Sequence, residues 1–172
     1  MTDKNDPEGQ SNPTASRPYM PGYGIQDAAS GRGLLPWSWA VERLTQARSY
    51  WVATARPDGR PHAMPVWGVW MEEAFYFSCG QASRKARNLA LNPACVVGCE
   101  PADEAVILEG RAELVTDPLT IARFAALYGP KYGWNMEGFA EPVYRVRPVA
   151  AFAFLAAPGE FTGSATRWTF PE

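Results

Sequence analysis

The sequence has little histidine and no excess of positive charge. His62 is the only imidazole, and 16 Lys and Arg residues stand against 18 Asp and Glu residues, a formal net charge of -2. A chain without net positive charge has no general field that attracts nucleic acid or anionic membranes. We therefore expect no nucleic-acid partner and no membrane partner. A mechanism that needs an imidazole would have to use His62.

Cysteine and long apolar runs are also scarce. Cys79, Cys95 and Cys99 are odd in number and lack CxxC spacing, and with a single histidine they make a poor zinc set. We expect buried free thiols and no metal site. No apolar run approaches a membrane span, and Met1 to Gln10 is polar where a signal peptide needs an apolar centre. These absences predict a cytoplasmic protein. No Walker loop, GxGxxG or Ser-His-Asp order supports a kinase, Rossmann or hydrolase interpretation.

Aromatic side chains are plentiful, at 13% of 172 residues with seven tryptophans. They suit a site that sandwiches a flat ring, although core packing alone would also explain them. Residues 1–18 are rich in Asp, Asn, Pro, Ser and Gly, so we predict a disordered N-terminal arm. Residues 19–36 set aromatic residues between Pro and Gly and predict an irregular strap. Residues 37–172 are long enough for one domain with its own core.

The pattern of strands predicts a mainly β (α+β) fold. A hairpin is expected from strands at 50–55 and 61–70, joined by Arg56-Pro57-Asp58-Gly59. Further strands are expected at 75–78, 94–99, 105–115, 143–155 and 166–170. Helices are expected from Trp37 to before Tyr50, from Ser83 to Leu91, and from Asp117-Pro118 to near Gly129. Such a pattern favours an antiparallel barrel of about six strands with inserted helices over a parallel α/β sheet.

The segment Ser83-Arg84-Lys85 is the strongest candidate for a binding site. Ser83 can cap a helix whose free N–H groups and dipole attract an anion beside two cations. A phosphate fits this arrangement. The alternative is an ordinary capped helix with a solvated basic face.

The order of motifs around this segment resembles the pyridoxamine 5'-phosphate oxidase-like family of flavin-binding split β-barrels. The matching residues are Phe75-Tyr76-Phe77-Ser78, a Gly-containing turn, Ser83-Arg84-Lys85-Ala86 and a helix ending at Asn92-Pro93, and the resemblance runs from about Trp37 to Phe170. It implies that Arg84 and Lys85 bind the cofactor phosphate, with hydroxyl donors nearby at Ser78 and Ser83. Phe77 and Asn88 belong to the same cofactor-binding segment by this resemblance.

The hairpin resembles the family's second motif, whose strand lies along the cofactor ring. The resemblance implies that Met64, Pro65, Val66 and Trp67 line the ring and that Gly68 permits close approach of a backbone or ring. An ordinary core strand remains the alternative. Arg167 and Trp168, with Tyr132 and Trp134, fall where family members contribute residues from the partner subunit. A homodimer with the cofactor at the subunit interface is therefore expected.

The sequence departs from the family motif at two positions, and these differences indicate which cofactor binds. Pyridoxamine phosphate oxidases proper carry an additional Arg and Lys where this sequence has Met64 and Val69. The hairpin sequence from His62 to Gly68, together with the helix sequence from Ser83 to Leu89, resembles more the branch that uses the deazaflavin coenzyme F420. This resemblance implies hydride transfer to a small electron-poor organic acceptor. Arg56, Arg60 and Arg87 are candidates to meet the polyglutamate tail of F420, and each is a solvated surface arginine in the alternative. No catalytic residue is assigned, because the cofactor carries the chemistry. The alternatives are an FMN-dependent enzyme of this fold and a non-catalytic binder of flavin, deazaflavin or haem.

Overall fold

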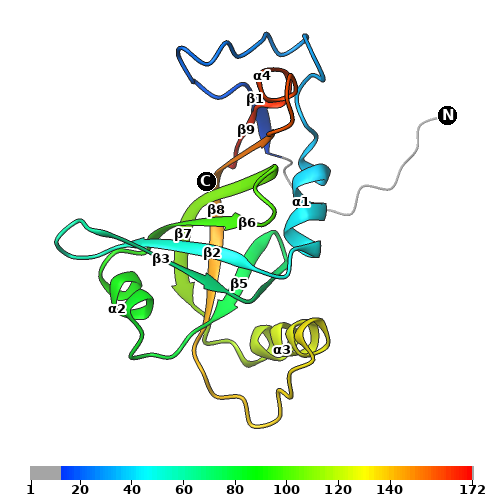
Figure 1. Ribbon diagram of the computed structural model, residues 1–172. Coiled ribbons are helices and arrows are strands. Elements are labelled where there is room, and N and C mark those ends of the chain that lie inside the picture. The colour runs from blue at the N-terminus through cyan, green and yellow to red at the C-terminus, as the bar shows by residue number, and fades with distance from the viewer. Residues whose placement is uncertain (1–12, 172) are drawn as a thin grey trace.

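The computed structural model describes residues 13–171, and it is mainly β with helices inserted between strands, as the sequence predicts (Figure 1). The strands are β1 Thr14–Ser16, β2 Tyr50–Ala55, β3 Pro61–Val66, β4 Gly68–Met71, β5 Ala74–Ser78, β6 Ala94–Cys99, β7 Glu104–Leu114, β8 Val143–Leu155 and β9 Thr166–Thr169. The helices are α1 Trp37–Gln46, α2 Arg84–Leu91, α3 Pro118–Tyr132 and α4 Phe161–Ser164. No helix within this part of the chain is long and apolar enough to cross a membrane.

All strands join one antiparallel sheet that follows the plan of a split barrel. The long strand β8 pairs with β7 along its length, with β5 through its first residues and with β9 through its last. The order around the barrel is β3-β2-β6-β7-β8-β5-β4. Because β3 and β4 are parts of one stretch of chain, that stretch forms both edges of the curled sheet. The sheet is not closed by hydrogen bonds between these edges.

The second strand of the predicted hairpin is broken. The sequence predicts a continuous strand over 61–70, whereas β3 ends at Val66 and β4 begins at Gly68. Trp67 lies between them and belongs to neither. β3 pairs with β2, and β4 pairs with β5 in the other half of the barrel. The break therefore allows one stretch of chain to change from one half of the barrel to the other.

The core lies inside the barrel and is closed on one side by α1. Tyr50, Phe75 and Leu108 are fully buried there, and Ala40 and Leu44 of α1 pack onto them. Trp168 is also in this core, only 1% exposed, with its ring 5.3 Å from that of Trp37. Burying a side chain of this size contributes roughly 1.5–3 kcal/mol. The structure thus places Trp168 in the core rather than on a cofactor, because no face of its ring is accessible.

The N-terminal segment is more ordered than the sequence suggests. Within the predicted disordered arm, residues 1–12 lie outside the described residues, but Thr14–Ser16 form β1 on the edge of β9. Arg17 then donates to the carbonyl oxygens of Ala165 (2.8 Å), Gly163 (3.1 Å), Asp27 (3.1 Å) and Ser30 (3.1 Å). One guanidinium therefore ties the strap to the turn formed by α4, at the end of the molecule away from α3 (Figure 1).

Helix α3 runs past its predicted end near Gly129. It continues to Tyr132 and ends where Gly133 takes a left-handed conformation, with φ of 65°. Pro130 lies in the last turn, where it removes only one backbone donor. The extra turn brings Lys131 and Tyr132 against the break between β3 and β4.

Candidate functional site

The start of α2 is the capped, basic helix end that the sequence predicts. The Ser83 hydroxyl oxygen accepts from the Ala86 amide at 3.2 Å, which satisfies one free donor of the first turn. Arg84 is exposed and Lys85 half-buried. Within residues 13–171 neither cation has an ion-pair partner. Both are therefore free to meet an anion.

The hairpin brings further basic groups to this helix end. Asn88 of α2 donates to the Thr54 hydroxyl at 2.9 Å, and Thr54 donates to the His62 carbonyl at 3.3 Å. His62 pairs directly with Thr54, so both lie on the face of the hairpin that α2 covers. The pKa of His62 is lowered by desolvation and then by the charges of Arg56, Lys85 and Arg84. The β2–β3 hairpin and α2 thus gather a basic cluster of Arg56, His62, Arg84 and Lys85.

Two buried polar atoms beside the basic cluster have no partner within the described residues. They are Nε of Arg56 and Oδ1 of Asn88, whose side chain is 1% exposed. Leaving a buried donor or acceptor unpaired costs about 1–3 kcal/mol. Arg56 has a donor to offer and Asn88 has an acceptor. A ligand that carries both an anionic group and hydroxyl groups, such as a phosphorylated polyol, matches this pair.

The other arginines of this region bind groups that are close to them in the sequence. Arg60 forms an ion pair with Asp58 in the hairpin turn, with 2.6 Å between Nη2 and Oδ2. Arg87 donates twice to the Ala82 carbonyl, at 2.7 and 3.1 Å, and so fixes the loop before α2. Of the arginines considered for a polyglutamate tail, only Arg56 joins the cluster.

The two predicted site residues at the end of β5 make contacts within the chain. Phe77 is fully buried and stacks on Phe75 and Tyr144 in the core, so its ring is not accessible. Ser78 donates its hydroxyl proton to the Pro142 carbonyl at 2.9 Å. Phe77 therefore belongs to the core, whereas Ser78 anchors the loop that follows α3 and its hydroxyl oxygen can still accept a hydrogen bond.

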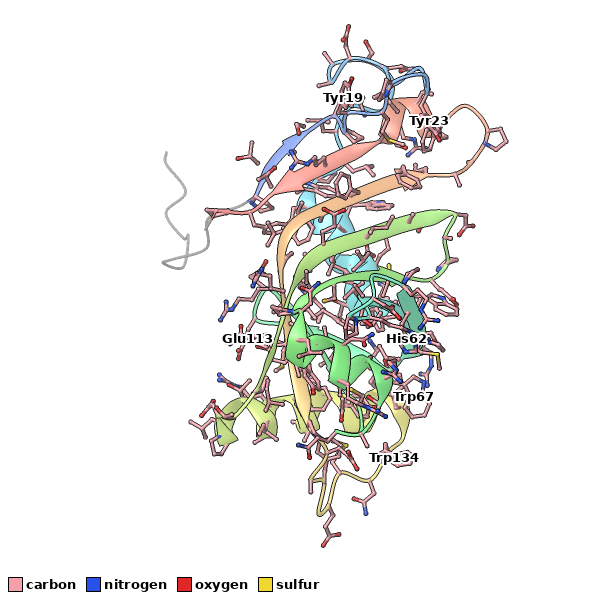
Figure 2. All side chains as sticks on the ribbon, turned by 90° about the vertical axis from the view of Figure 1, so that its left-hand side faces the viewer. Tyr19, Tyr23, His62, Trp67, Glu113 and Trp134 are labelled. Carbon is pink, nitrogen blue, oxygen red and sulfur yellow. The ribbon has the colours of Figure 1, made fainter. Side chains whose placement is uncertain are left out.

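The predicted ring-binding strand offers exposed side chains at the edge of the sheet. Met64 is 45% exposed and Trp67 44% exposed, Pro65 is exposed, and Val66 is buried. The Trp67 indole stacks on Tyr132 with ring centroids 4.7 Å apart and planes within 4°. Figure 2 places His62, Trp67 and Trp134 along one side of the molecule, away from Tyr19 and Tyr23. An accessible aromatic surface therefore adjoins the basic cluster.

Gly68 has a different role from the predicted one. A Cβ at this position would lie 2.3 Å from the Phe75 ring. The space that a side chain at residue 68 would need is therefore occupied by the core and not by a ligand. The Gly68 amide donates to the Tyr132 hydroxyl at 3.0 Å, and its carbonyl accepts from Tyr132 at 2.8 Å and from Lys131 at 3.1 Å. The end of α3 thus replaces the sheet hydrogen bonds that are lost at the break. Lys131 was missed in the sequence, because no local motif marks it.

Arg167 lies far from the site of its own chain. It belongs to β9, which pairs with β8 at the end of the molecule that carries α4, whereas β3 and α2 lie toward the other end (Figure 1). Arg167 pairs with Phe152, so it lies on the outer face of the sheet, while its neighbour Trp168 points into the core. Only a second subunit could bring an Arg167 to this site.

Two hollows flank the aromatic surface. One, of about 720 Å³, lies between the loop Gly80–Ala82 and the segment from Trp134 to Pro142. The other, of about 310 Å³, is lined by Ser49, Pro65, Val66, Trp67 and Tyr128. Ligand pockets typically measure 300–1,000 Å³. Both hollows are large enough for a small molecule or part of a larger one.

Comparison with known proteins identifies the family of the chain. A sequence model described as pyridoxamine 5'-phosphate oxidase matches residues 40–156, which include the hairpin, α2 and all of β8. The chain belongs to the pyridoxamine 5'-phosphate oxidase family. No curated protein matches the sequence.

Solved structures similar to this member of the family have diverse descriptions. An F420 reductase is 27% identical with a TM-score of 0.53, over 64% of this chain and 93% of that one. The conserved hypothetical protein Rv2991 of Mycobacterium tuberculosis is 20% identical with a TM-score of 0.65, over 72% and 86%. The haem storage protein HutZ of Vibrio cholerae is 20% identical with a TM-score of 0.54, over 65% and 86%. At these identities the last two show the shared fold alone.

Proposed function

We propose that this protein is an oxidoreductase that binds reduced coenzyme F420 and delivers its hydride to a small, planar, electron-poor organic acceptor. The observation that carries the proposal is the basic cluster of Arg56, His62, Arg84 and Lys85 beside the exposed edge of β3. When bound, the deazaflavin supplies the hydride chemistry. The chain holds the phosphate, orients the ring and excludes water.

The roles within the site follow from the contacts. Arg84, Lys85 and the first turn of α2 would hold the phosphate, and charge-assisted hydrogen bonds to phosphate are about twice as strong as neutral ones. Arg56 Nε and Asn88 Oδ1 would gain the partners that they lack, from the phosphate and from a hydroxyl of the polyol chain. Met64 and Trp67 would contact the ring.

The surroundings of Met64 and Val69 favour a deazaflavin over FMN. Pyridoxamine phosphate oxidases proper, which this chain resembles, carry an Arg and a Lys at these positions. Here Val69 is buried with Met71 and Phe124, and Met64 presents a thioether at the edge of β3. Neither position offers a charge to a phosphate. The 27% identity to a structure described as an F420 reductase supports the same choice.

A homodimer is part of the proposal, because the outer face of the barrel is apolar. Directly paired residues share a face, and the apolar pairs on this face are Pro65 with Trp51 and Ala63 with Ala53, with Val96 beside Ala53. Glu109, which pairs with Val96, is a charged residue on the same face. Trp51 is 45% exposed. An apolar face of this kind on neighbouring strands is typical of an interface. A partner seated there would lie next to the exposed ring-binding strand.

Anaerobic turnover tests the proposal. Purified protein is mixed with reduced F420 and a panel of quinones, enones and heteroaromatic acceptors, and the absorbance of oxidised F420 is followed. Acceptor-dependent oxidation is the expected result. Purification of a yellow protein that carries FMN would instead establish the FMN-dependent alternative. Tight binding of F420, flavin or haem without turnover on any acceptor would establish a binding protein.

A further inference from the structure

The smaller hollow joins the end of the ring-binding strand to two residues outside the cofactor site, Ser49 and Tyr128. Its walls are Ser49, just after α1, the end of β3 from Pro65 to Trp67, and Tyr128 of α3. Three separate elements therefore meet around a space of about 310 Å³. The pocket shares Pro65, Val66 and Trp67 with the ring-binding strand, but it contains no member of the basic cluster.

The chemistry of the lining restricts what the pocket can hold. Two aromatic rings, a proline and a valine form its walls, and the polar groups among its side chains are the hydroxyls of Ser49 and Tyr128 and the indole N–H of Trp67. No lining residue carries a charge at neutral pH. The volume lies at the lower end of the range for ligand pockets. The lining thus suits an uncharged planar molecule of one or two rings with an oxygen or nitrogen for a hydroxyl to meet.

Lys131 fastens the three walls to one another. Its Nζ donates to the Gly68 carbonyl at 3.1 Å, to the Tyr50 hydroxyl at 2.9 Å and to the Thr45 carbonyl at 3.2 Å. Its backbone carbonyl accepts from Arg48 at 3.0 Å. These partners adjoin Trp67 on one side and Ser49 on the other. All three protons of the ammonium group are used, so Lys131 has none to spare for a ligand.

The Trp67 wall is held in the same way. Tyr132 binds the Gly68 peptide at both its N–H and its carbonyl, and its ring stacks on the indole of Trp67. Trp134 meets the same indole edge-on, with centroids 6.2 Å apart. The orientation of Trp67 is therefore fixed before any ligand arrives, which lowers the entropic cost of binding a flat molecule against it.

We propose that this pocket binds the hydride acceptor, that the acceptor is an uncharged planar molecule of one or two rings, and that Lys131 is a positioning residue for it. The inference rests on the proposed function, because it takes the neighbouring strand as the seat of the cofactor ring. For a quinone acceptor, reduced deazaflavin gives up a hydride and a proton, and the quinone takes up both to become the hydroquinone.

Binding of a probe to a pocket-filling variant tests the site independently of turnover. The probe is 2,3-dimethyl-1,4-naphthoquinone, whose substituted ring positions prevent thiol addition. Its affinity is measured by calorimetry for wild type, Ser49→Trp and a matched control, Ser38→Trp, which adds the same side chain on the exposed surface of α1. Wild type and Ser38→Trp should bind equally, and Ser49→Trp should bind at least tenfold more weakly. Equal binding by Ser49→Trp, or no binding by wild type, would overturn the proposal.

A parallel titration with F420 separates this inference from the proposed function. Ser49→Trp should keep its F420 affinity within about twofold, because Ser49 lies outside the basic cluster. If wild type binds the probe but not F420, the proposed function fails while the pocket stands. Lys131→Met should weaken the probe several-fold and Lys131→Arg should restore part of that loss. Unchanged probe affinity in a folded Lys131→Met protein would remove Lys131 from this role.

Discussion

Basic side chains close together in the sequence have different local partners, and the partners decide which of them can bind an anion. Arg60 is held by Asp58 and Arg87 by the Ala82 carbonyl. Arg84 and Lys85 have no such partner among the described residues and lie with Arg56 around His62. The site is thus defined less by how many cations are present than by which ones lack a local partner.

Replacing Arg84 and Lys85 together by alanine should weaken F420 binding strongly. Each charge-assisted hydrogen bond contributes about 1.5–3 kcal/mol, so the dissociation constant should rise roughly tenfold or more for each one lost. Fluorescence-quench titration at fixed ionic strength measures the change. Arg60→Ala is the matched control, because it removes a nearby cation that is already paired, and it should change the affinity by less than about threefold. Equal losses in both proteins would refute a specific phosphate site.

Lys131 should make stability depend on pH in the alkaline range. Burial and the charge of Arg48 lower the pKa of Lys131 from 10.5 to about 8. Between these values the unfolded chain binds more protons at this position than the folded one, so its contribution to the free energy of unfolding rises with pH. The stability of wild type relative to Lys131→Met should therefore increase from pH 8 towards pH 10. Urea denaturation of both proteins at pH 7, 8.5 and 9.5 measures this difference, and a constant difference would contradict the lowered pKa.

At the scale of elements, Gly110 allows the backbones of β7 and β8 to approach each other closely. The register of the two strands shifts there, and a Cβ on Gly110 would lie 2.3 Å from the Arg147 carbonyl oxygen. Backbone cannot give way as a side-chain tip can. Gly110→Ala should therefore destabilise the fold by about 2–3 kcal/mol, as overpacking does. Gly98→Ala is the control on the adjoining strand β6, where a new Cβ meets nothing within 4 Å. Thermal unfolding of the two variants should separate them clearly.

The elements that the sequence predicts well are those with local signals. Ser83 was predicted as a cap because capping depends on groups within three residues of it, and the turn at Arg56–Gly59 was predicted from its own residue types. The break at Trp67 has no such signal. It exists because β3 and β4 belong to opposite halves of the barrel and because Lys131 and Tyr132 arrive from a distant helix.

The candidate site shows the same limit. The motif residues Arg84, Lys85 and Met64 are where a ligand could reach them, since the motif itself fixes the helix start and the strand edge. Phe77 and Trp168 are buried by strands and helices far from them in sequence, so no local pattern shows that their rings are inaccessible. Likewise, Thr14–Ser16 pair with β9 near the other end of the chain. Composition alone could not predict this long-range pairing.

At the scale of the molecule, the apolar outer face of the barrel predicts a homodimer. Trp51→Glu should convert the protein to a monomer at micromolar concentration, because it would bury an unpaired carboxylate at the interface, beside the Glu100 carboxylate that accepts from the Trp51 indole at 2.6 Å. The same change should weaken F420 binding if the partner completes the site. Sedimentation velocity and a parallel F420 titration measure both effects.

A matched control for the dimer lies on α3. Leu119 is 72% exposed on α3, which lies below the barrel strands (Figure 1), so Leu119→Glu should leave both the assembly and the affinity unchanged. A wild-type monomer at micromolar concentration would contradict the proposed interface. It would also mean that Arg167 does not contact the cofactor, since β9 lies at the α4 end of the molecule, away from β3 and α2 (Figure 1).

The basic cluster and the exposed strand edge are proposed to bind a phosphorylated deazaflavin together. The most direct test is a side-by-side titration of the purified protein with F420 and with FMN at equal ionic strength. We predict micromolar or tighter binding of F420 and FMN binding weaker by about tenfold or more, the cost of roughly one unmet charge-assisted hydrogen bond. Tighter binding of FMN, or binding of neither, would contradict the account.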